Sequence, residues 1–167
     1  MYLYLIRHGI AVDAPISDSV VSDELRSLSK VGRKKVAQVA IKLQKMELIF
    51  DLIITSPLVR ARQTADILME QQLSPQLEIS DDLKPLGNLP AWLMTWNARS
   101  MDTAISNLAL VGHEPSLSQW AELLLFGQVR DKLVLKKGGM IGLKFPDRHL
   151  EIGAAQLHCL IPPKYLN

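Results

Sequence analysis

The sequence predicts an α/β fold, a three-layer α/β/α sandwich with a mostly parallel central sheet. Short apolar runs at 2–6, 52–54 and 108–111 have the length and composition of buried strands. Between them lie longer segments whose apolar residues recur at the spacing of amphipathic helices. Alternating strands and helices favour a parallel sheet that is covered by helices on both faces.

Two helices follow the first two predicted strands. Ser29 is the expected N-cap of the first helix, and Ser56, with Pro57 at the first helical position, is the expected start of the second. Apolar side chains at helical spacing predict which positions face the core. They are Val36, Val39, Ala40, Leu43 and Met46 in the first helix, and Ala61, Ala65, Leu68 and Met69 in the second.

The second half of the chain continues the alternation of strands and helices. We expect a short strand at 77–79, a helix around Pro90–Arg99, the strand Leu108–Val111 and a helix opened by Pro115. Extended segments at 133–135, 140–145 and 155–161, with a turn at Gly138-Gly139, are interpreted as two or three antiparallel additions at one edge. The inward positions of the last helix are Leu117, Ala121, Leu124 and Leu125.

Composition places the chain among ordinary globular proteins. Its 167 residues fit one domain, so we expect residues 1–167 to form a single unit. The one cysteine, Cys159, excludes an internal disulfide framework and a cysteine-based zinc site. A net charge of +2 and a 5% aromatic content, not interleaved with basic runs, give no sign of a nucleic-acid surface.

The sequence also lacks an apolar stretch long enough to span a bilayer. The apolar run 2–6 has no basic region before it and meets Arg7 and His8 at once, so we interpret it as a strand and not as a signal peptide. We therefore expect a cytoplasmic protein without membrane contact. Nothing in the sequence requires more than a monomer.

Polar residues stand at the ends of three predicted strands. Arg7 and His8 end the first strand, Arg60 lies in the first turn of the helix after the second, and His113 follows the strand at 108–111. Ligands of open α/β sheets bind beyond the carboxyl ends of the strands, so we expect these side chains at one edge. Guanidinium groups bind phosphoryl oxygens, and imidazoles can attack phosphorus or donate protons. Each residue alone is more often structural, and only the ordered set predicts a phosphoryl site.

Four motifs follow one another along the chain: Leu5-Ile6-Arg7-His8-Gly9, then residues 26–33, 55–65 and 110–115. Together they resemble the motifs of the histidine phosphatase superfamily, the phosphoglycerate-mutase-like proteins. Within that superfamily the chain looks most like the small SixA-type phosphohistidine phosphatases. The resemblance implies a phosphoglycerate-mutase-like fold without a large helical lid insertion.

The resemblance implies a two-step mechanism. His8 would attack phosphorus and become phosphorylated, and water would then release phosphate. Arg7 and Arg60 would keep the attacking imidazole neutral and stabilise the equatorial oxygens of the transition state. His113 would also contact the phosphoryl group. Because these side chains supply the positive charge, no metal and no other cofactor is expected.

One departure from the family's pattern narrows the range of expected substrates. Many members carry a glutamate as general acid where this chain has Pro85, and SixA-type members show a similar pattern. A departing alkoxide needs a proton, whereas an imidazole leaving from a P–N bond can already be protonated. We therefore expect a phosphorylated protein histidine as substrate. Asp81, Asp82 and Glu114 are alternative proton donors, with surface charge or helix capping as their simpler interpretation.

The segment between Leu83 and the strand near 108 has room for one helix, so the predicted pocket has no large lid. A shallow pocket suits a phosphoryl group presented by another protein, such as a histidine-containing phosphotransfer domain. Trp92 and Trp96 share one face of the expected helix. Core packing is their simpler role, and a surface for docking a partner helix is the alternative.

Two other functions stay open at this point. The same site could hydrolyse small phosphate monoesters, or the protein could be a non-catalytic module that binds phosphate or other small anions. The presence of His8, which only the chemistry requires, disfavours the binding module.

Overall fold

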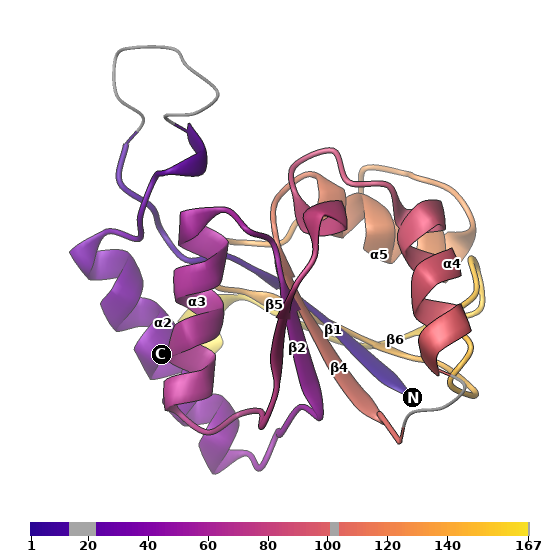
Figure 1. The fold of residues 1–167 in the computed structure, drawn as a ribbon, viewed down its shortest axis with the longest axis horizontal. Coiled ribbons are helices and arrows are strands. Elements are labelled where there is room, and N and C mark those ends of the chain that lie inside the picture. Colours follow the sequence, from indigo (N-terminus) through magenta and orange to yellow (C-terminus); the bar gives the residue numbers. More distant parts are fainter. Residues whose placement is uncertain (14–22, 101–103, 167) are drawn as a thin grey trace.

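The computed structural model describes residues 1–13, 23–100 and 104–166, and the fold below refers to these residues (Figure 1). They form a six-stranded sheet with strand order β3-β2-β4-β1-β5-β6. The first four strands in that order pair in parallel, whereas β5 is antiparallel to both β1 and β6. The predicted sheet, mostly parallel with antiparallel strands at one edge, is confirmed. The strands are β1 (Tyr2–Arg7), β2 (Leu52–Thr55), β3 (Leu77–Ile79), β4 (Asn107–Gly112), β5 (Met140–Lys144) and β6 (Gln156–Ile161).

Helices cover both faces of the sheet, which confirms the three-layer sandwich. Helices α2 and α3 pack on one face, and α4 and α5 pack on the other (Figure 1). Across the described segments, no large helical insertion is evident and no helix is both long and apolar enough to cross a membrane. The helices are α2 (Lys30–Lys45), α3 (Val59–Glu70), α4 (Leu89–Ser100) and α5 (Ser116–Phe126), with short 3-10 turns at Asp81–Leu83 and Pro163–Tyr165.

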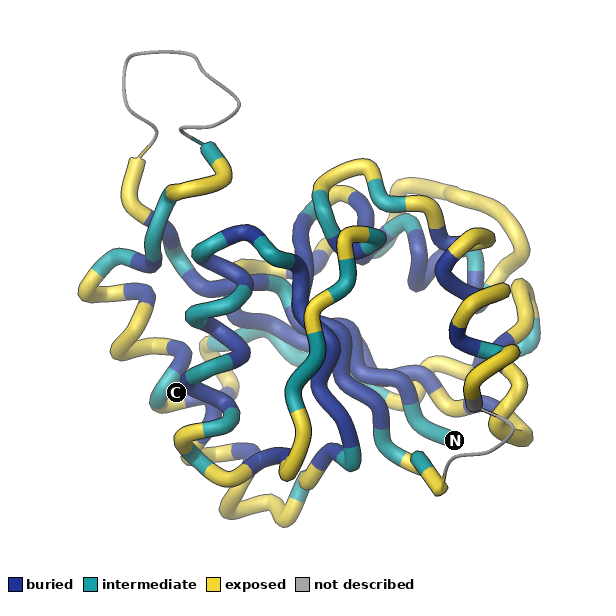
Figure 2. Tube along the Cα trace, in the orientation of Figure 1, coloured by how far each residue is buried: buried dark blue, intermediate teal, exposed yellow. Residues whose placement is uncertain are grey.

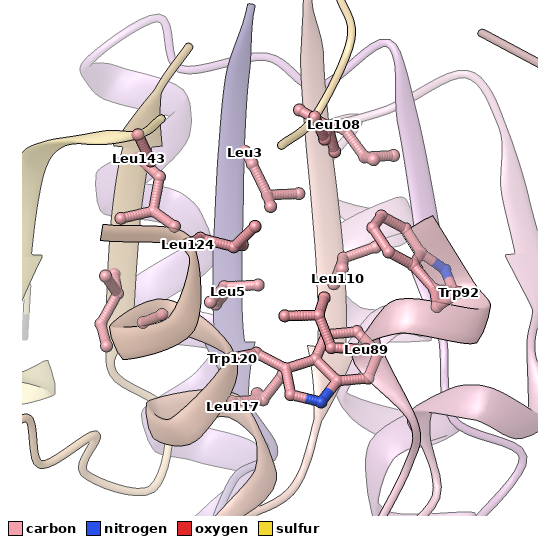
Figure 3. Close-up of a cluster of buried hydrophobic side chains, with 14 of the residues drawn as sticks. Leu3, Leu5, Leu89, Trp92, Leu108, Leu110, Leu117, Trp120, Leu124 and Leu143 are labelled. Carbon is pink, nitrogen blue, oxygen red and sulfur yellow. The ribbon is translucent and has the colours of Figure 1, made fainter. Parts of the chain in front are cut away.

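Successive side chains of the central strands point to opposite faces of the sheet and so form two buried apolar clusters. In β1, Leu3 and Leu5 face the α4–α5 layer, whereas Tyr4 and Ile6 face the α2–α3 layer. Figure 2 shows the middle of the sheet buried, and Figure 3 shows Leu3 and Leu5 among the side chains of the first cluster. Burying one such leucine contributes about 1.5–3 kcal/mol, so both faces of the sheet hold the helices in place.

The two tryptophans of α4 belong to the core. Trp92 and Trp96 are each 3% exposed, and their rings stack with centroids 5.8 Å apart. Trp92 also packs against Trp120 of α5, at 5.6 Å between ring centroids. The core-packing interpretation is therefore correct, and neither ring offers a docking surface.

The start of α3 differs from the prediction. Ser29 caps α2 as expected, but α3 begins at Val59 with Leu58 as its N-cap. The predicted start at Ser56 and Pro57 is wrong. The Ser56 hydroxyl instead accepts a hydrogen bond from the Leu58 N–H at 3.3 Å and closes a turn that precedes the helix.

Two further expectations are wrong, one in the segment after α5 and one at the end of α2. Residues 133–135 are not a strand, because the N–H of Leu133 donates to the Glu122 carboxylate and that of Leu135 donates to the Ser118 hydroxyl. The segment is thus tied to α5 and stays outside the sheet. Met46, expected to face the core, lies just beyond the end of α2 and is 52% exposed.

A buried carboxylate holds the loop that follows α5. Glu122 is 1% exposed, and its two oxygens accept hydrogen bonds from the backbone N–H groups of residues 130–133. The bonds from Asp131 and Leu133 are 2.7 and 2.8 Å long. Burial alone raises the pKa of this carboxyl, but the four backbone donors outweigh burial and lower the pKa to about 2.

Replacing Glu122 by Gln should destabilise the protein by about 1–3 kcal/mol at pH 7, because the amide turns an N–H group toward backbone donors. The pKa of Glu122 falls from an ordinary value of 4.5 to about 2. Its stabilising effect is therefore complete above pH 4.5 and is lost as the pH falls toward 2. Urea unfolding at both ends of this range should show the difference between wild type and Glu122→Gln shrinking in acid.

The exposed Glu70→Gln serves as the matched control and should change stability little at either pH. Equal stability of wild type and Glu122→Gln at pH 7, or a difference that does not shrink in acid, would contradict this role of the carboxylate.

Candidate active site

Pairing of β1 with β4 places two histidines side by side. The register aligns Arg7 with Gly112, and the N–H of His8 donates to the Gly112 carbonyl at 3.1 Å. His8 and His113 therefore leave the sheet at the same edge, with ring centroids 5.1 Å apart. Both side chains are buried. The structure brings these two predicted residues together as expected.

Close packing against α2 fixes the loop that carries His8. A Cβ atom on Gly32 would lie 1.9 Å from the backbone oxygen of Ile10, and one on Gly9 would lie 2.5 Å from the Val36 side chain. The backbone after β1 can therefore rest on the first turns of α2 only because both positions are glycine.

The His8 ring has a defined tautomer. Its Nδ1 lies 2.6 Å from the carbonyl oxygen of Gly9, which can only accept, so Nδ1 carries the hydrogen. Nε2 accepts a hydrogen bond from Nε of Arg60 at 3.3 Å. The lone pair of a neutral imidazole is thus held at Nε2, beside a guanidinium group. That is the form in which an imidazole can attack phosphorus.

Burial and nearby positive charge keep both rings neutral. Burial lowers the pKa of His8 to about 4, and Arg60 and Arg7 act in the same direction. Burial likewise lowers the pKa of His113 to about 3, with a further contribution from His8. At pH 7 the positive charge of the site therefore resides on its arginines.

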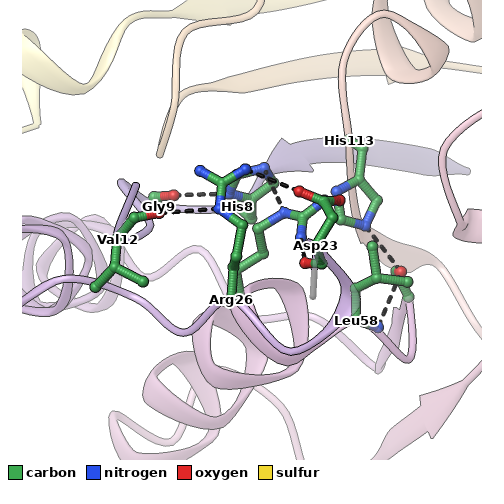
Figure 4. Close-up of polar contacts among 9 residues, drawn as sticks. His8, Gly9, Val12, Asp23, Arg26, Leu58 and His113 are labelled. Atoms are coloured by element: carbon green, nitrogen blue, oxygen red, sulfur yellow. Dashed lines mark hydrogen bonds and ion pairs between the residues drawn. The ribbon is translucent and has the colours of Figure 1, made fainter. Parts of the chain in front are cut away.

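Arg60 is the most firmly anchored of these arginines, at 5% exposure. Besides its contact with His8, Nη1 donates to the backbone oxygen of Asp23 at 2.7 Å and Nη2 donates to the Asp23 carboxylate at 3.0 Å (Figure 4). The Thr64 hydroxyl donates to the Arg60 carbonyl at 2.8 Å and accepts from the N–H of Gly9 at 3.0 Å. Thr64 thus ties α3 to the loop that carries His8.

Two polar atoms of the site are buried without a hydrogen-bond partner among the described residues. Nε2 of His113 lies 2.8 Å from the Ser56 hydroxyl, but its Nδ1 has no such partner. Arg7 donates from Nη1 to the Leu135 carbonyl at 2.9 Å, but its Nε has none. Buried polar atoms are normally hydrogen-bonded. This pair suits a ligand that is rich in oxygen atoms, such as a phosphoryl group.

The hydrogen bonds and ion pairs of the three alternative proton donors go to residues other than Arg7, His8, Arg60 and His113, although the charge of Glu114 acts on Arg7. Asp81 is exposed and pairs with Lys84 at 2.9 Å, and Asp82, in the same 3-10 turn, accepts a hydrogen bond from the Ser80 hydroxyl at 3.3 Å. Glu114 accepts hydrogen bonds from the N–H and the hydroxyl of Ser118, at 3.2 and 2.6 Å, and so caps α5. Helix capping and surface charge account for the observed contacts of these carboxylates.

Sequence reasoning missed several residues that shape the site. Asp23 lies in a short helical turn before α2, and no local sequence pattern marks it as a site residue. Ser56 and Thr64 lie within a recognised motif, but spacing alone cannot show that one contacts His113 and the other links two segments. Nor could it show that the Leu135 carbonyl holds Arg7, because that contact joins positions 128 residues apart.

Within the described segments, no three His, Cys, Asp or Glu side chains form a group that could hold a metal ion. What the site does offer is a buried, neutral imidazole with its lone pair at Nε2, a second imidazole and two guanidinium groups. This set can bind a phosphoryl group and accept it covalently.

Known proteins share the sequence motifs and the fold of this chain. The model of the histidine phosphatase superfamily (branch 1) matches residues 3–89, which include most of β1 and all of α2, β2 and α3. The chain belongs to the histidine phosphatase superfamily. Members of this superfamily are phosphatases. An uncharacterized protein of Picosynechococcus sp. is 41% identical over 170 residues, with 99% of each chain covered.

Solved structures of several phosphatases share the fold at low sequence identity. The protein histidine phosphatase SixA, complexed with tungstate, matches with a TM-score of 0.83 and 20% identity over 100% of both chains. The alpha-ribazole phosphatase of Shigella flexneri matches at 0.68, with 19% identity over 98% of this chain and 97% of its own. A phosphoserine phosphatase of Entamoeba histolytica, in complex with 3-phosphoglyceric acid, matches at 0.63, with 18% identity over 99% of both chains.

The neutral state of His8 can be measured directly. Long-range ¹H–¹⁵N spectra of labelled protein should show His8 as the tautomer protonated at Nδ1, unchanged from about pH 7.5 to about pH 5.5, because its pKa is about 4. A free histidine peptide, which titrates near 6.5, is the reference. His8 signals that move with the reference, or that show hydrogen on Nε2, would contradict the geometry described above.

Proposed function

We propose that the protein is a metal-independent phosphohistidine phosphatase that acts on phosphorylated protein histidine. The observation that carries the proposal is the buried His8 ring, whose Nε2 lone pair faces Arg60 and whose pKa of about 4 keeps it unprotonated. A nucleophile in that state forms a covalent phospho-enzyme without first losing a proton.

Each residue of the site has a separate role in the proposed reaction. Nε2 of His8 attacks phosphorus, and the bond to the leaving nitrogen breaks as the new P–N bond forms. Arg60 and Arg7 stabilise the negative charge on the transferring oxygens. His113, held at Nε2 by Ser56, presents Nδ1 to the same group. Water then attacks phosphorus, releases phosphate and restores His8.

Two observations favour a P–N bond over an ester. Pro85 stands where many superfamily members have an acid, and the alternative carboxylates Asp81, Asp82 and Glu114 bind Lys84, Ser80 and Ser118. An imidazole that is already protonated can depart without a general acid, whereas an alkoxide cannot depart easily. The similarity to SixA, a protein histidine phosphatase, agrees with this choice.

Hydrolysis of small phosphate monoesters is the second candidate. It is favoured by the fold that the chain shares with an alpha-ribazole phosphatase and a phosphoserine phosphatase. The short region between β3 and β4, with the single helix α4 among its described residues, leaves a site suited to a phosphoryl group on a protein surface. We therefore place a protein substrate first and a small ester second.

One assay of phosphate release in EDTA distinguishes the two candidate functions. Wild type should release phosphate from a histidine-phosphorylated phosphotransfer domain faster, by kcat/KM, than from phosphoserine or p-nitrophenyl phosphate. His8→Ala should lose about 10³-fold or more, because the nucleophile is gone. Arg60→Ala should lose about 10²–10³-fold, because a donor to the transition-state charge is gone.

Two variants control for this assay. Arg62→Ala changes an arginine on the same helix that pairs with Asp66 and is 43% exposed, and His149→Ala changes an exposed histidine. Both should retain wild-type rates. Faster turnover of the esters would make the second candidate correct, and full activity of His8→Ala would rule out both.

A further inference from the structure

The Asp23 carboxylate lies in the site and has no part in the mechanism above. Its Oδ2 accepts a hydrogen bond from Nη2 of Arg60 at 3.0 Å, and its Oδ1 accepts one from Nη1 of Arg26 at 2.8 Å. Arg26 is itself held, because its Nε donates to the Val12 carbonyl at 2.9 Å. In Figure 4, Asp23 lies beside Arg26 and near His8 and His113.

The edge of Arg60 that Asp23 occupies is the edge that faces His8. In a guanidinium group, the N–H of Nε and one N–H of Nη2 point the same way and form one bidentate fork. In Arg60 this fork donates to Nε2 of His8 at 3.3 Å and to Asp23 Oδ2 at 3.0 Å. A phosphoryl group that lies against Nε2 of His8 needs the same two N–H groups. The carboxylate and the phosphoryl oxygens therefore compete for them.

Asp23 also stays charged under ordinary conditions. The hydrogen bond from Arg26 lowers the pKa of its carboxyl, burial opposes that effect, and Arg60 lowers the pKa further. An ionised carboxylate is a poor proton donor, so it cannot replace the missing general acid. It is instead a fixed negative charge beside the nucleophile, in a side chain that is 45% exposed.

We propose that Asp23 is a specificity-determining residue, an internal anion that any phosphoryl group must displace from Arg60. The exchange weakens binding of free phosphate and of phosphate esters, because each brings negative charge toward the carboxylate. A phosphoryl group on a protonated imidazole brings a positive leaving group, which the carboxylate attracts. This selectivity rests on the proposed phosphohistidine phosphatase function, whereas the competition for Arg60 does not.

Binding of inorganic phosphate tests the competition without turnover. Asp23→Asn keeps the shape of the side chain and the backbone oxygen that accepts from Nη1 of Arg60, but it removes the charge. It should bind phosphate about tenfold more tightly than wild type in calorimetric titrations, which corresponds to about 1.4 kcal/mol. Asp23→Ala should also bind phosphate more tightly than wild type, and it provides a second variant if the first one folds poorly.

Asp66→Asn is the matched control. Asp66 is also 45% exposed in its side chain and pairs with an arginine of α3, Arg62, at 3.1 Å. It should leave phosphate affinity within about twofold of wild type, since surface ion pairs contribute little. Unchanged or weaker phosphate binding by both Asp23 variants would overturn the proposal, because Asp23 would then only position Arg60.

The selectivity is tested by comparing substrates. In Asp23→Asn, kcat/KM for p-nitrophenyl phosphate should rise about tenfold relative to kcat/KM for the histidine-phosphorylated domain. An unchanged ratio would overturn the claim that the carboxylate discriminates by leaving-group charge. Absence of phosphohistidine turnover in wild type would refute the proposed function instead, and the phosphate titrations would still decide whether Asp23 competes for Arg60.

Discussion

The site depends on the parallel pairing of β1 with β4 in the centre of the sheet. That register aligns Arg7 with Gly112, so the residues that follow, His8 and His113, leave the sheet at the same level. A shift of one strand by one residue would turn its apolar side chains to the opposite face of the sheet and would move the two rings apart. The buried leucines on one face of the pair and the aromatic and aliphatic side chains on the other fix this register.

Charge is distributed in the site so that His8, the proposed nucleophile, stays neutral. Burial and the neighbouring arginines disfavour protonation of both histidines. The Gly9 carbonyl and the Arg60 guanidinium bind opposite nitrogens of the His8 ring, and they orient its lone pair. Positive charge sits on groups that never lose it, and the one carboxylate on Arg60, that of Asp23, sets which anions can enter. Binding and reactivity thus come from the same few contacts.

Local sequence patterns were enough to predict most of the fold and the four residues Arg7, His8, Arg60 and His113. Apolar runs and helical spacing suffice to predict the sheet, because strand ends are set by the change from apolar to polar residues. The same patterns could not show where a backbone N–H group donates its hydrogen bond to a side chain and not to another backbone group. Ser56 follows the rule for an N-cap but instead closes a turn and contacts His113, so α3 starts later. Residues 133–135 have the apolar character of a strand, yet the distant Glu122 binds their backbone.

The most direct test of this account is to trap the phosphorylated enzyme. Wild type would be mixed with a ³²P-labelled histidine-phosphorylated domain in EDTA, quenched in base within milliseconds and mapped by mass spectrometry. If Nε2 of His8 is the nucleophile, an acid-labile, base-stable phosphate should be found on His8, absent in His8→Ala and present in the His149→Ala control. Rapid phosphate release without any such species, or a phosphate carried by His113 instead, would contradict the central role given to Nε2 of His8.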